Sequence, residues 1–218
     1  MKLYQFYYSP FAAKVRKCLD LKGLACEMVE VPMLDRRALV AVTGGSIIVP
    51  VLEDGDQVIN DSPRITAYLE RYAPTLRPVP TAVIIESWSD NIVEEIAFRI
   101  AAPGIDERIA AHNGGRADAR AMFRLIKERK YGVGCLEAWR DQRDESIARL
   151  KTLLAPVEEA LRTNAFILGD SPTLADAAVY GQLFMIEWAI HGFVSGLPAP
   201  LAEWYHRIDA APALPRRP

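Results

Sequence analysis

The chain has 218 residues, half of them hydrophobic, which is enough to bury a substantial core in one large domain or two small ones. Its formal net charge of −2 offers no basic surface to a polyanion, so no nucleic-acid partner is expected. No apolar run approaches the roughly 20 residues that cross a bilayer, and Met1-Lys2 leads into a patterned segment without the apolar stretch of a signal peptide. We therefore expect a cytoplasmic protein that makes no membrane contact.

The cysteines and histidines indicate neither a disulfide framework nor a metal site. The three cysteines are odd in number and widely spaced, which fits reduced thiols. The three histidines lack the spacing of metal ligands. We expect no bound metal.

Strands and helices alternate in the first third of the chain. The aromatic-rich segment 2–8 predicts a strand, and Ser9-Pro10 is a helix-start signal ahead of a helix at 12–21. The elements expected after it are a strand at 26–31, a short helix at 35–42, a hairpin of 47–52 with 57–60, and a helix that Ser62 caps and Pro63 begins. This order predicts a compact α/β unit.

A connector rich in proline follows, and the pattern changes after it. Three prolines between Ala73 and Pro80 break any helix and place a domain boundary there. Beyond it the chain lacks strand alternation, and Trp88, Ile92, Ile96 and Ile100 recur at helical spacing. We expect an all-helical second domain, with breaks at 113–115 and 131–134 and an irregular tail at 211–218.

Pro50 stands inside the apolar run 47–52, where a proline would damage a central strand. The position suggests a special geometry such as a cis peptide bond, with an ordinary edge-strand proline as the alternative. Val49-Pro50-Val51-Leu52, the acidic glycine turn after it, and Asn60-Asp61-Ser62 resemble, in order and spacing, the glutathione site of the soluble glutathione transferase superfamily. The resemblance implies a thioredoxin-like glutathione-binding domain at 1–75 and an all-α domain at 82–218 that contributes the second-substrate pocket.

The resemblance also implies which residues hold glutathione. The backbone at Ile48 and Val49, beside a cis Pro50, would pair with the cysteinyl part of the peptide. Asp61 and Ser62 would hold its γ-glutamyl end, where a helix N-terminus attracts a carboxylate and an acidic side chain meets an ammonium group. Many members place a lysine or glutamine near the glycyl carboxylate. This chain has none at that point, so Arg37 or its neighbour Arg36 is the candidate replacement.

Ser9 is the leading candidate for the catalytic residue. The start Ser9-Pro10-Phe11 is similar to that of serine-type members, including plant tau-like proteins, whose serine stabilises the glutathione thiolate. Neither Ser9 nor Ala12 is a cysteine, so redox exchange through a protein thiolate is disfavoured. Tyr7 is the second candidate, because other classes use a tyrosine from the first strand.

The remaining site predictions concern the helical domain. Phe11, Trp88 and Ile92 are candidates to line the second-substrate pocket, although residues such as Trp88 and Ile92 more often belong to a core. The segment from Gly169 to Asp176 resembles the capping box of the family, in which Thr173 and Asp176 cap the core helix.

The resemblance implies a homodimeric glutathione S-transferase that directs the glutathione thiolate at a small electrophile, typically in detoxification. A glutathione-dependent isomerase or a dehalogenase on the same fold is an alternative within the enzyme class. A non-catalytic protein that binds glutathione or a protein partner is the alternative from a different class.

Overall fold

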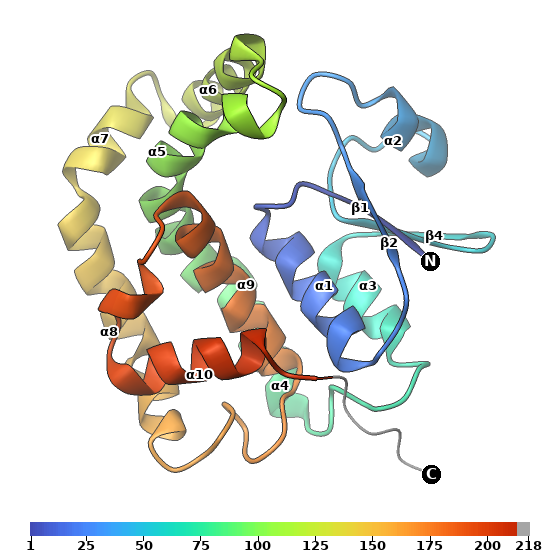
Figure 1. Cartoon of the computed structure of the whole chain (residues 1–218), viewed down its shortest axis with the longest axis vertical. Helices are drawn as coiled ribbons and strands as arrows, with labels where there is room; N and C mark the ends of the chain where they lie inside the picture. Colours follow the sequence, from blue (N-terminus) through green and yellow to red (C-terminus); the bar gives the residue numbers. More distant parts are fainter. Residues whose placement is uncertain (213–218) are drawn as a thin grey trace.

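The computed structural model describes residues 1–212 and shows a small sheet with three helices, followed by a larger bundle of helices (Figure 1). The elements of the first part are β1 (Lys2–Gln5), α1 (Pro10–Leu21), β2 (Glu27–Glu30), α2 (Arg37–Thr43), β3 (Val51–Asp54), β4 (Gln57–Asn60) and α3 (Ser62–Leu69). Those of the second part are α4 (Pro80–Trp88), the π-helical turn η1 (Ser89–Val93), α5 (Glu94–His112), α6 (Ala117–Tyr131), α7 (Cys135–Asp141), α8 (Arg143–Leu161), α9 (Leu174–Ala189), the 3-10 turn η2 (Val194–Gly196) and α10 (Ala199–Asp209).

The four strands form a mixed sheet in the order β2-β1-β3-β4, with β1 parallel to β2 and antiparallel to β3. Successive side chains of a strand point to opposite faces, and the register pairs Leu3 with Leu52 and Tyr4 with Val51. Leu3 and Leu52 belong to the main core with α1 and α3, whereas Tyr4 and Val51 pack with Leu39 of α2. The predicted thioredoxin-like arrangement is confirmed, with helices on both faces of the sheet.

Two predicted strands end or begin several residues away from where the sequence pattern indicated. The strand at 2–8 ends at Gln5, because the chain then turns and the Ser9 N–H donates to the Phe6 carbonyl at 2.9 Å. The strand at 47–52 begins only at Val51, since Pro50 has no N–H to give to a ladder. Residues 6–8 and 47–50 are therefore loops, and both lie beside the cavities described below.

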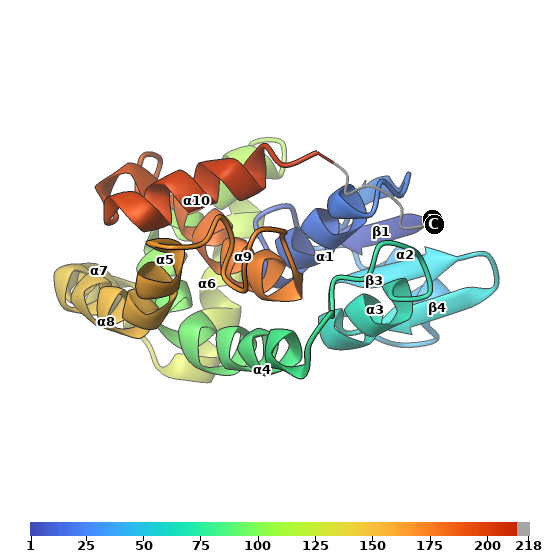
Figure 2. The same cartoon turned by 90° about the horizontal axis from the view of Figure 1, so that it is seen from below.

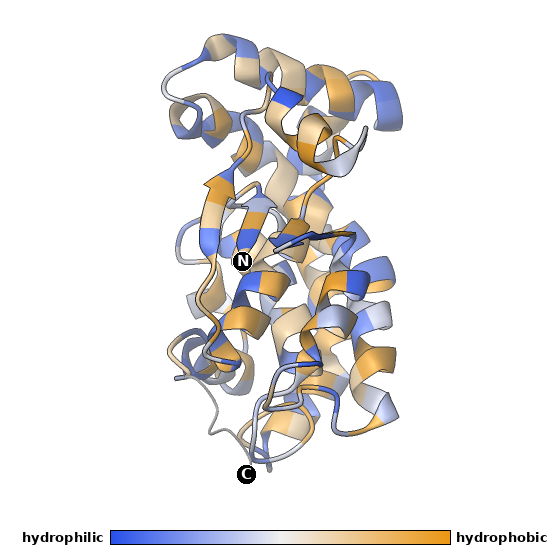
Figure 3. Ribbon diagram, turned by 90° about the vertical axis from the view of Figure 1, so that its right-hand side faces the viewer, coloured by the Kyte–Doolittle hydropathy of each residue, from blue (hydrophilic) through white to orange (hydrophobic). Residues whose placement is uncertain are grey.

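The second part is helical, as predicted, and the breaks at 113–115 and 131–134 separate α5 from α6 and α6 from α7. Hydrophobic and hydrophilic residues alternate in bands along these helices, as expected where one face of each packs on a core (Figure 3). The predicted irregular tail at 211–218 lies, from residue 213 on, outside the described residues. No helix of the described chain is long and apolar enough to cross a membrane.

Helix α9 is the centre of the molecule and packs against both α1 and α5 (Figure 2). Its predicted capping box is confirmed: Asp176 accepts the Thr173 N–H at 2.8 Å, and also the indole N–H of Trp204 at 2.9 Å. Gly181 faces the start of α1 so closely that a Cβ there would overlap the Pro10 carbonyl oxygen. The helical bundle therefore supports the N-terminus of α1 directly.

Helices α4 and α5 are continuous through η1, where the helix widens into a π turn. The predicted four-residue spacing fails at this turn, because Ile92 is 50% exposed whereas its neighbour Val93 is fully buried. Ile96 and Ile100, beyond the turn, are buried as expected. The extra residue of a π turn shifts the phase of the buried face by about one position.

Candidate functional site

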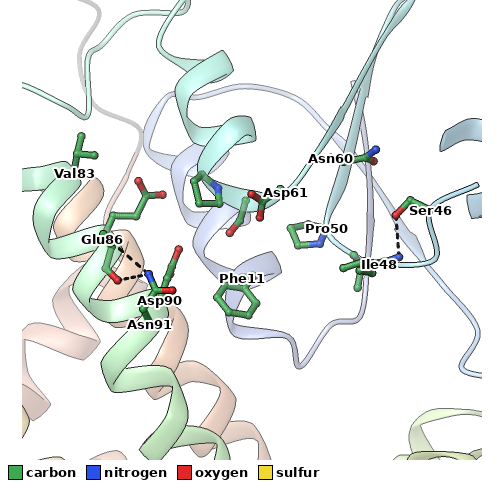
Figure 4. A pocket seen from close by; sticks show the side chains of 14 residues that line it. Phe11, Ser46, Ile48, Pro50, Asn60, Asp61, Val83, Glu86, Asp90 and Asn91 are labelled. Carbon is green, nitrogen blue, oxygen red and sulfur yellow. Dashed lines mark hydrogen bonds between the residues drawn. The ribbon is translucent and has the colours of Figure 1, made fainter. Parts of the chain in front are cut away.

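A cavity of about 550 Å³ opens between the loop before β3, the start of α3 and the helix α4; we call it the first cavity. Figure 4 shows Ile48 and Pro50 on one side of it and Glu86 and Asp90 on the other, with Asp61 and Phe11 between them. Of the predicted glutathione residues, Ile48, Val49, Pro50, Asp61 and Ser62 all line this cavity. The structure thus brings together residues that are far apart in sequence.

The loop before β3 presents a free stretch of backbone to the first cavity. The Val49–Pro50 peptide bond is cis, the special geometry that the sequence suggested. Within residues 1–212 no hydrogen bond engages the N–H or C=O of Val49, whereas the Ile48 N–H donates to the Ser46 hydroxyl at 3.3 Å. An extended peptide could therefore pair with Val49 as an added strand.

The start of α3 differs by one residue from the prediction. We expected Ser62 to cap the helix, but Asp61 is the N-cap, because its carbonyl accepts the Ile65 N–H at 2.9 Å and Ser62 is already helical. Asp61 has a φ of +76°, a left-handed conformation that a residue with a side chain rarely adopts. The Ser62 hydroxyl makes no hydrogen bond within the described chain and lines the cavity. Such local strain is characteristic of ligand sites.

A buried charge cluster forms the α4 side of the first cavity. Lys14 of α1, which is 1% exposed, donates to Glu86 at 2.9 Å and to Asp90 at 2.5 Å. Glu86 also accepts from Thr66 at 2.9 Å and lies 3.3 Å from the Arg77 guanidinium. The cluster therefore joins the sheet part to the helical part through α1, α3 and α4.

Two buried oxygens of the first cavity have no hydrogen-bond donor in the described chain: Oδ1 of Asp90 and Oδ1 of Asn60. Burial raises the pKa of Asp90 to about 6, although Lys14 opposes the shift, and the charges of Glu86 and Asp61 raise it further. Both unpaired atoms are hydrogen-bond acceptors, and a buried acceptor without a donor costs free energy. The cavity is therefore suited to a ligand that presents N–H donors, such as an ammonium group.

A second cavity, of about 220 Å³, lies on the other side of Phe11, which lines both spaces. Ser9 lines the second cavity; its hydroxyl accepts the Ala12 N–H at 3.4 Å and so caps α1. Because the hydroxyl accepts there, its own proton stays free to be donated. Ser9 is 8% exposed, so this donor lies at the helix N-terminus in a largely dry place.

The structure does not bring Tyr7 to either cavity. With β1 ending at Gln5, the Tyr7 ring turns to the far side of α1, where it lies 4.7 Å from the Arg16 guanidinium and 5.4 Å from the ring of Phe184. The neighbouring Tyr8 lines the second cavity instead, and burial raises the pKa of its phenol.

Arg37 also lies apart from the cavities. Its side chain is 91% exposed and pairs with Asp35 at 2.6 Å. Arg36 is closer to the loop, since it donates to the Ile47 carbonyl at 2.5 Å and lines the second cavity. In the described part of the chain, no lysine, arginine or histidine lines the first cavity.

Trp88 and Ile92 line neither cavity. Trp88 packs over an apolar hollow with Ile85 and Leu153, and the exposed Ile92 lies in the π turn. Sequence reasoning missed several helix residues that do line the cavities, among them Glu86, Asp90, Glu94, Phe98 and Lys127. The four-residue spacing of Glu86 and Asp90 was the available signal for the first cavity, because such spacing places two acidic groups on one helix face.

A thioredoxin-like domain joined to an all-helical domain, with cavities at their junction, defines a class of two-domain proteins. The profile described as the N-terminal domain of glutathione S-transferase matches residues 3–78, and that of the C-terminal domain matches residues 137–207. The curated Glutathione S-transferase 4 of Zea mays is 28% identical over 224 residues, which cover 98% of this chain and 89% of that protein. The chain belongs to the glutathione S-transferase superfamily.

Solved structures agree on the fold. A glutathione S-transferase from Rhodospirillum rubrum superposes with a TM-score of 0.68 at 23% identity, covering 97% of this chain and 88% of that one. A glutathione S-transferase of Ceriporiopsis subvermispora, solved in complex with glutathione, gives a TM-score of 0.76 at 17% identity over 97% and 98% of the two chains.

Proposed function

We propose that this protein is a serine-type glutathione S-transferase that binds glutathione in the first cavity and activates its thiol with Ser9. The observation that carries the proposal is the position of the Ser9 hydroxyl, a free donor at the N-terminus of α1 beside Phe11, where the two cavities adjoin. The family membership and the glutathione complex of the Ceriporiopsis relative support the choice of thiol.

The first cavity offers a partner for most parts of glutathione. The Val49 backbone would pair with the cysteinyl residue, and Ser62 with the first N–H groups of α3 would bind the γ-glutamyl carboxylate. The γ-glutamyl ammonium would lie between Asp61 and Asp90 and satisfy the unpaired Oδ1 of Asp90. The glycyl carboxylate would rely on the Ser46 hydroxyl and loop backbone, with Arg36 as the nearer cation than Arg37.

The energetic requirement for Ser9 is modest. A free thiol has a pKa of about 8.5, so only a few per cent is thiolate at pH 7. Lowering that pKa by about 2 units requires about 2.7 kcal/mol of preferential thiolate stabilisation. One charge-assisted hydrogen bond and a helix dipole supply this amount. The thiolate then attacks an electrophilic carbon; the C–S bond forms and the leaving group departs with its bonding pair.

We also propose a homodimer in the cytoplasm. The three free cysteines fit a reducing compartment, and exposed Val83 and Ile84 on α4 fit a helix covered by a second copy. A glutathione-dependent isomerase or dehalogenase would use the same thiolate. Assays of the protein with glutathione and a panel of electrophilic, isomerisable and halogenated compounds would distinguish these reactions.

The test is the ultraviolet signal of bound glutathione thiolate, titrated with pH on the native chain, Ser9→Ala and Tyr7→Phe. We expect a depressed thiol pKa that Ser9→Ala abolishes and Tyr7→Phe retains. Loss in Tyr7→Phe alone would reject Ser9 as the stabilising group. Saturable glutathione binding without any thiolate signal would favour a non-catalytic binding protein instead.

A further inference from the structure

Lys127 is an unpaired cation in the wall of the second cavity. Its ammonium nitrogen lies 4.5 Å from the centroid of the Phe98 ring and 5.2 Å from that of Phe123, and all three residues line the cavity. Within residues 1–212 no carboxylate lies within salt-bridge distance of it. Burial lowers its pKa, with a smaller contribution from Lys130.

In the described chain Arg120 and Arg124 of the same helix have carboxylate partners, while Arg129 and Lys130 are unpaired but exposed and line neither cavity. Lys127 is thus the unpaired cation of α6 that lines a cavity. Arg120 and Arg124 both pair with the buried Asp106, at 2.9 and 2.8 Å, and Arg116 pairs with Asp118 at 2.6 Å. Those side chains point to the bundle or to solvent, whereas Lys127 faces an aromatic space. Cation–π contacts offset part of the cost of burying its charge, but they supply no counter-charge.

The other residues that line the second cavity indicate which kind of ligand could supply a counter-charge to Lys127. Phe6, Tyr8, Phe11, Phe98 and Phe123 provide aromatic surface. Arg36 adds a second cation, whose guanidinium lies 4.6 Å from the Phe6 ring centroid, and Glu94 adds one carboxylate. Burial raises the pKa of Glu94, which weakens its role as a counter-charge. Two cations and one carboxylate leave an excess of positive charge.

We propose that the second cavity selects an aromatic electrophile that carries an acidic group, with Lys127 as the specificity-determining residue. The ring of such a compound would stack among the phenylalanines while its carboxylate or sulfonate pairs with the Lys127 ammonium. That the compound reacts as an electrophile rests on the proposed function. The preference of the cavity for an aromatic anion does not, so binding and turnover can be tested separately.

The first experiment measures binding alone, with two fluorescent probes that share an anilinonaphthalene body. 8-Anilinonaphthalene-1-sulfonate carries an anionic group, and N-phenyl-1-naphthylamine lacks it. We expect Lys127→Met to weaken binding of the sulfonate about tenfold and to leave the neutral probe unchanged, a loss of the size of one charge-assisted contact. Lys127→Arg should retain most of the preference.

Two further variants make the result specific to the cavity. Lys130→Met removes a cation less than one turn away on α6 that does not line the cavity, so it should change neither probe. Glu94→Gln removes the carboxylate and should tighten sulfonate binding about threefold, the opposite sign from Lys127→Met. Equal weakening of both probes by Lys127→Met, or no weakening of either, would overturn the proposal.

The second experiment measures turnover with 4-chloro-3,5-dinitrobenzoate and its methyl ester, each corrected for its uncatalysed reaction with glutathione. In both, the thiolate displaces chloride, which leaves with the bonding pair as the C–S bond forms. We expect Lys127→Met to lower kcat/KM about tenfold for the acid only. Equal losses for acid and ester would reject the specificity while leaving the transferase function intact. Selective sulfonate binding without conjugation of either compound would reject the transferase function alone.

Discussion

The two cavities adjoin at Phe11 but differ in the chemistry of their walls. The first contains Asp61, Glu86 and Asp90, exposes backbone, and in the described chain is lined by no cation. The second is walled by aromatic rings and contains the cations Arg36 and Lys127. One space is therefore suited to donors and peptide backbone, and the other to a flat apolar body with negative charge.

A single continuous helix lines both cavities. The end of α4 with η1 gives Glu86 and Asp90 to the first cavity, and the start of α5 gives Glu94 and Phe98 to the second. Glu86 and Asp90 of the first cavity are held by Lys14, whereas Glu94 makes no ion pair in the described chain. The two carboxylates that this helix gives to the first cavity therefore share a buried cation, and the one that it gives to the second has none in the described chain.

The largest change in stability is expected from removing Lys14, which pairs with Glu86 and Asp90 beside the first cavity. Lys14→Met leaves Glu86 and Asp90 buried without their shared cation, so we expect the free energy of unfolding to fall by about 3–5 kcal/mol. Urea denaturation measures this change. Arg99→Met on α5 is the control and should cost about 0.5 kcal/mol or less, since both side chains of its pair with Glu95 are exposed.

Adding Glu86→Gln and Asp90→Asn to Lys14→Met should restore part of the lost stability, because the buried charges are then removed together. A loss below about 1 kcal/mol for Lys14→Met alone would show that the cluster is hydrated and loosely paired.

The affinity for glutathione should depend on pH through Asp90. Its pKa of about 6 means that the carboxylate is ionised above pH 6 and protonated below it. Glutathione affinity should therefore rise between pH 5 and 7, a range in which α-carboxyl groups (pKa about 3.5) and the thiol (about 8.5) do not titrate. Asp90→Asn should remove this step and weaken binding about tenfold at pH 7.

Isothermal calorimetry across this pH range measures the step, and Glu95→Gln, an exposed carboxylate paired with Arg99, is the control. The groups facing Asp90 are Lys14, Glu86 and Asp61. A pH step that persists in Asp90→Asn would assign the titration to one of the other carboxylates.

A smaller change in ligand affinity is expected at Phe11, which lines both cavities. Phe11→Leu keeps apolar volume but removes the ring from both cavities, so affinities for glutathione and for 8-anilinonaphthalene-1-sulfonate should each fall about threefold. Calorimetry and probe fluorescence give the two values. Phe184→Leu, on the far side of α1, should change neither; a change confined to one ligand in Phe11→Leu would mean that the cavities are independent.

The smallest expected effect is that of Arg37→Ala. The side chain is exposed and pairs only with Asp35, so glutathione affinity and stability should change by less than about 0.5 kcal/mol. A tenfold loss of glutathione affinity would instead show that Arg37 reaches the glycyl carboxylate when the ligand binds.

Local patterns were enough to predict the α/β unit and the helical second part, because each rests on residues close in sequence. The cis bond at Pro50 followed from the resemblance of the surrounding segment to a glutathione site, since most X–Pro bonds are trans. The local patterns did not predict that β1 ends at Gln5, and so misplaced Tyr7, because residues 6–8 continue the aromatic pattern of the strand although the chain already turns between Phe6 and Ser9. Nor did the four-residue spacing predict which face of the helix Trp88 and Ile92 occupy, because the π turn at Ser89–Val93 interrupts that spacing. The spacing of Glu86 and Asp90 was a local signal, whereas the cavity residues of α6 become apparent only when distant helices meet.

The π turn at Ser89–Val93 also bears on how such a protein could diverge. Removing one residue from the turn would return the helix to regular α geometry and rotate α4 by about 100° relative to α5. Either Glu86 would turn away from its cavity or Phe98 from the other. A single codon therefore separates a helix that serves two neighbouring cavities from one that can serve only one of them.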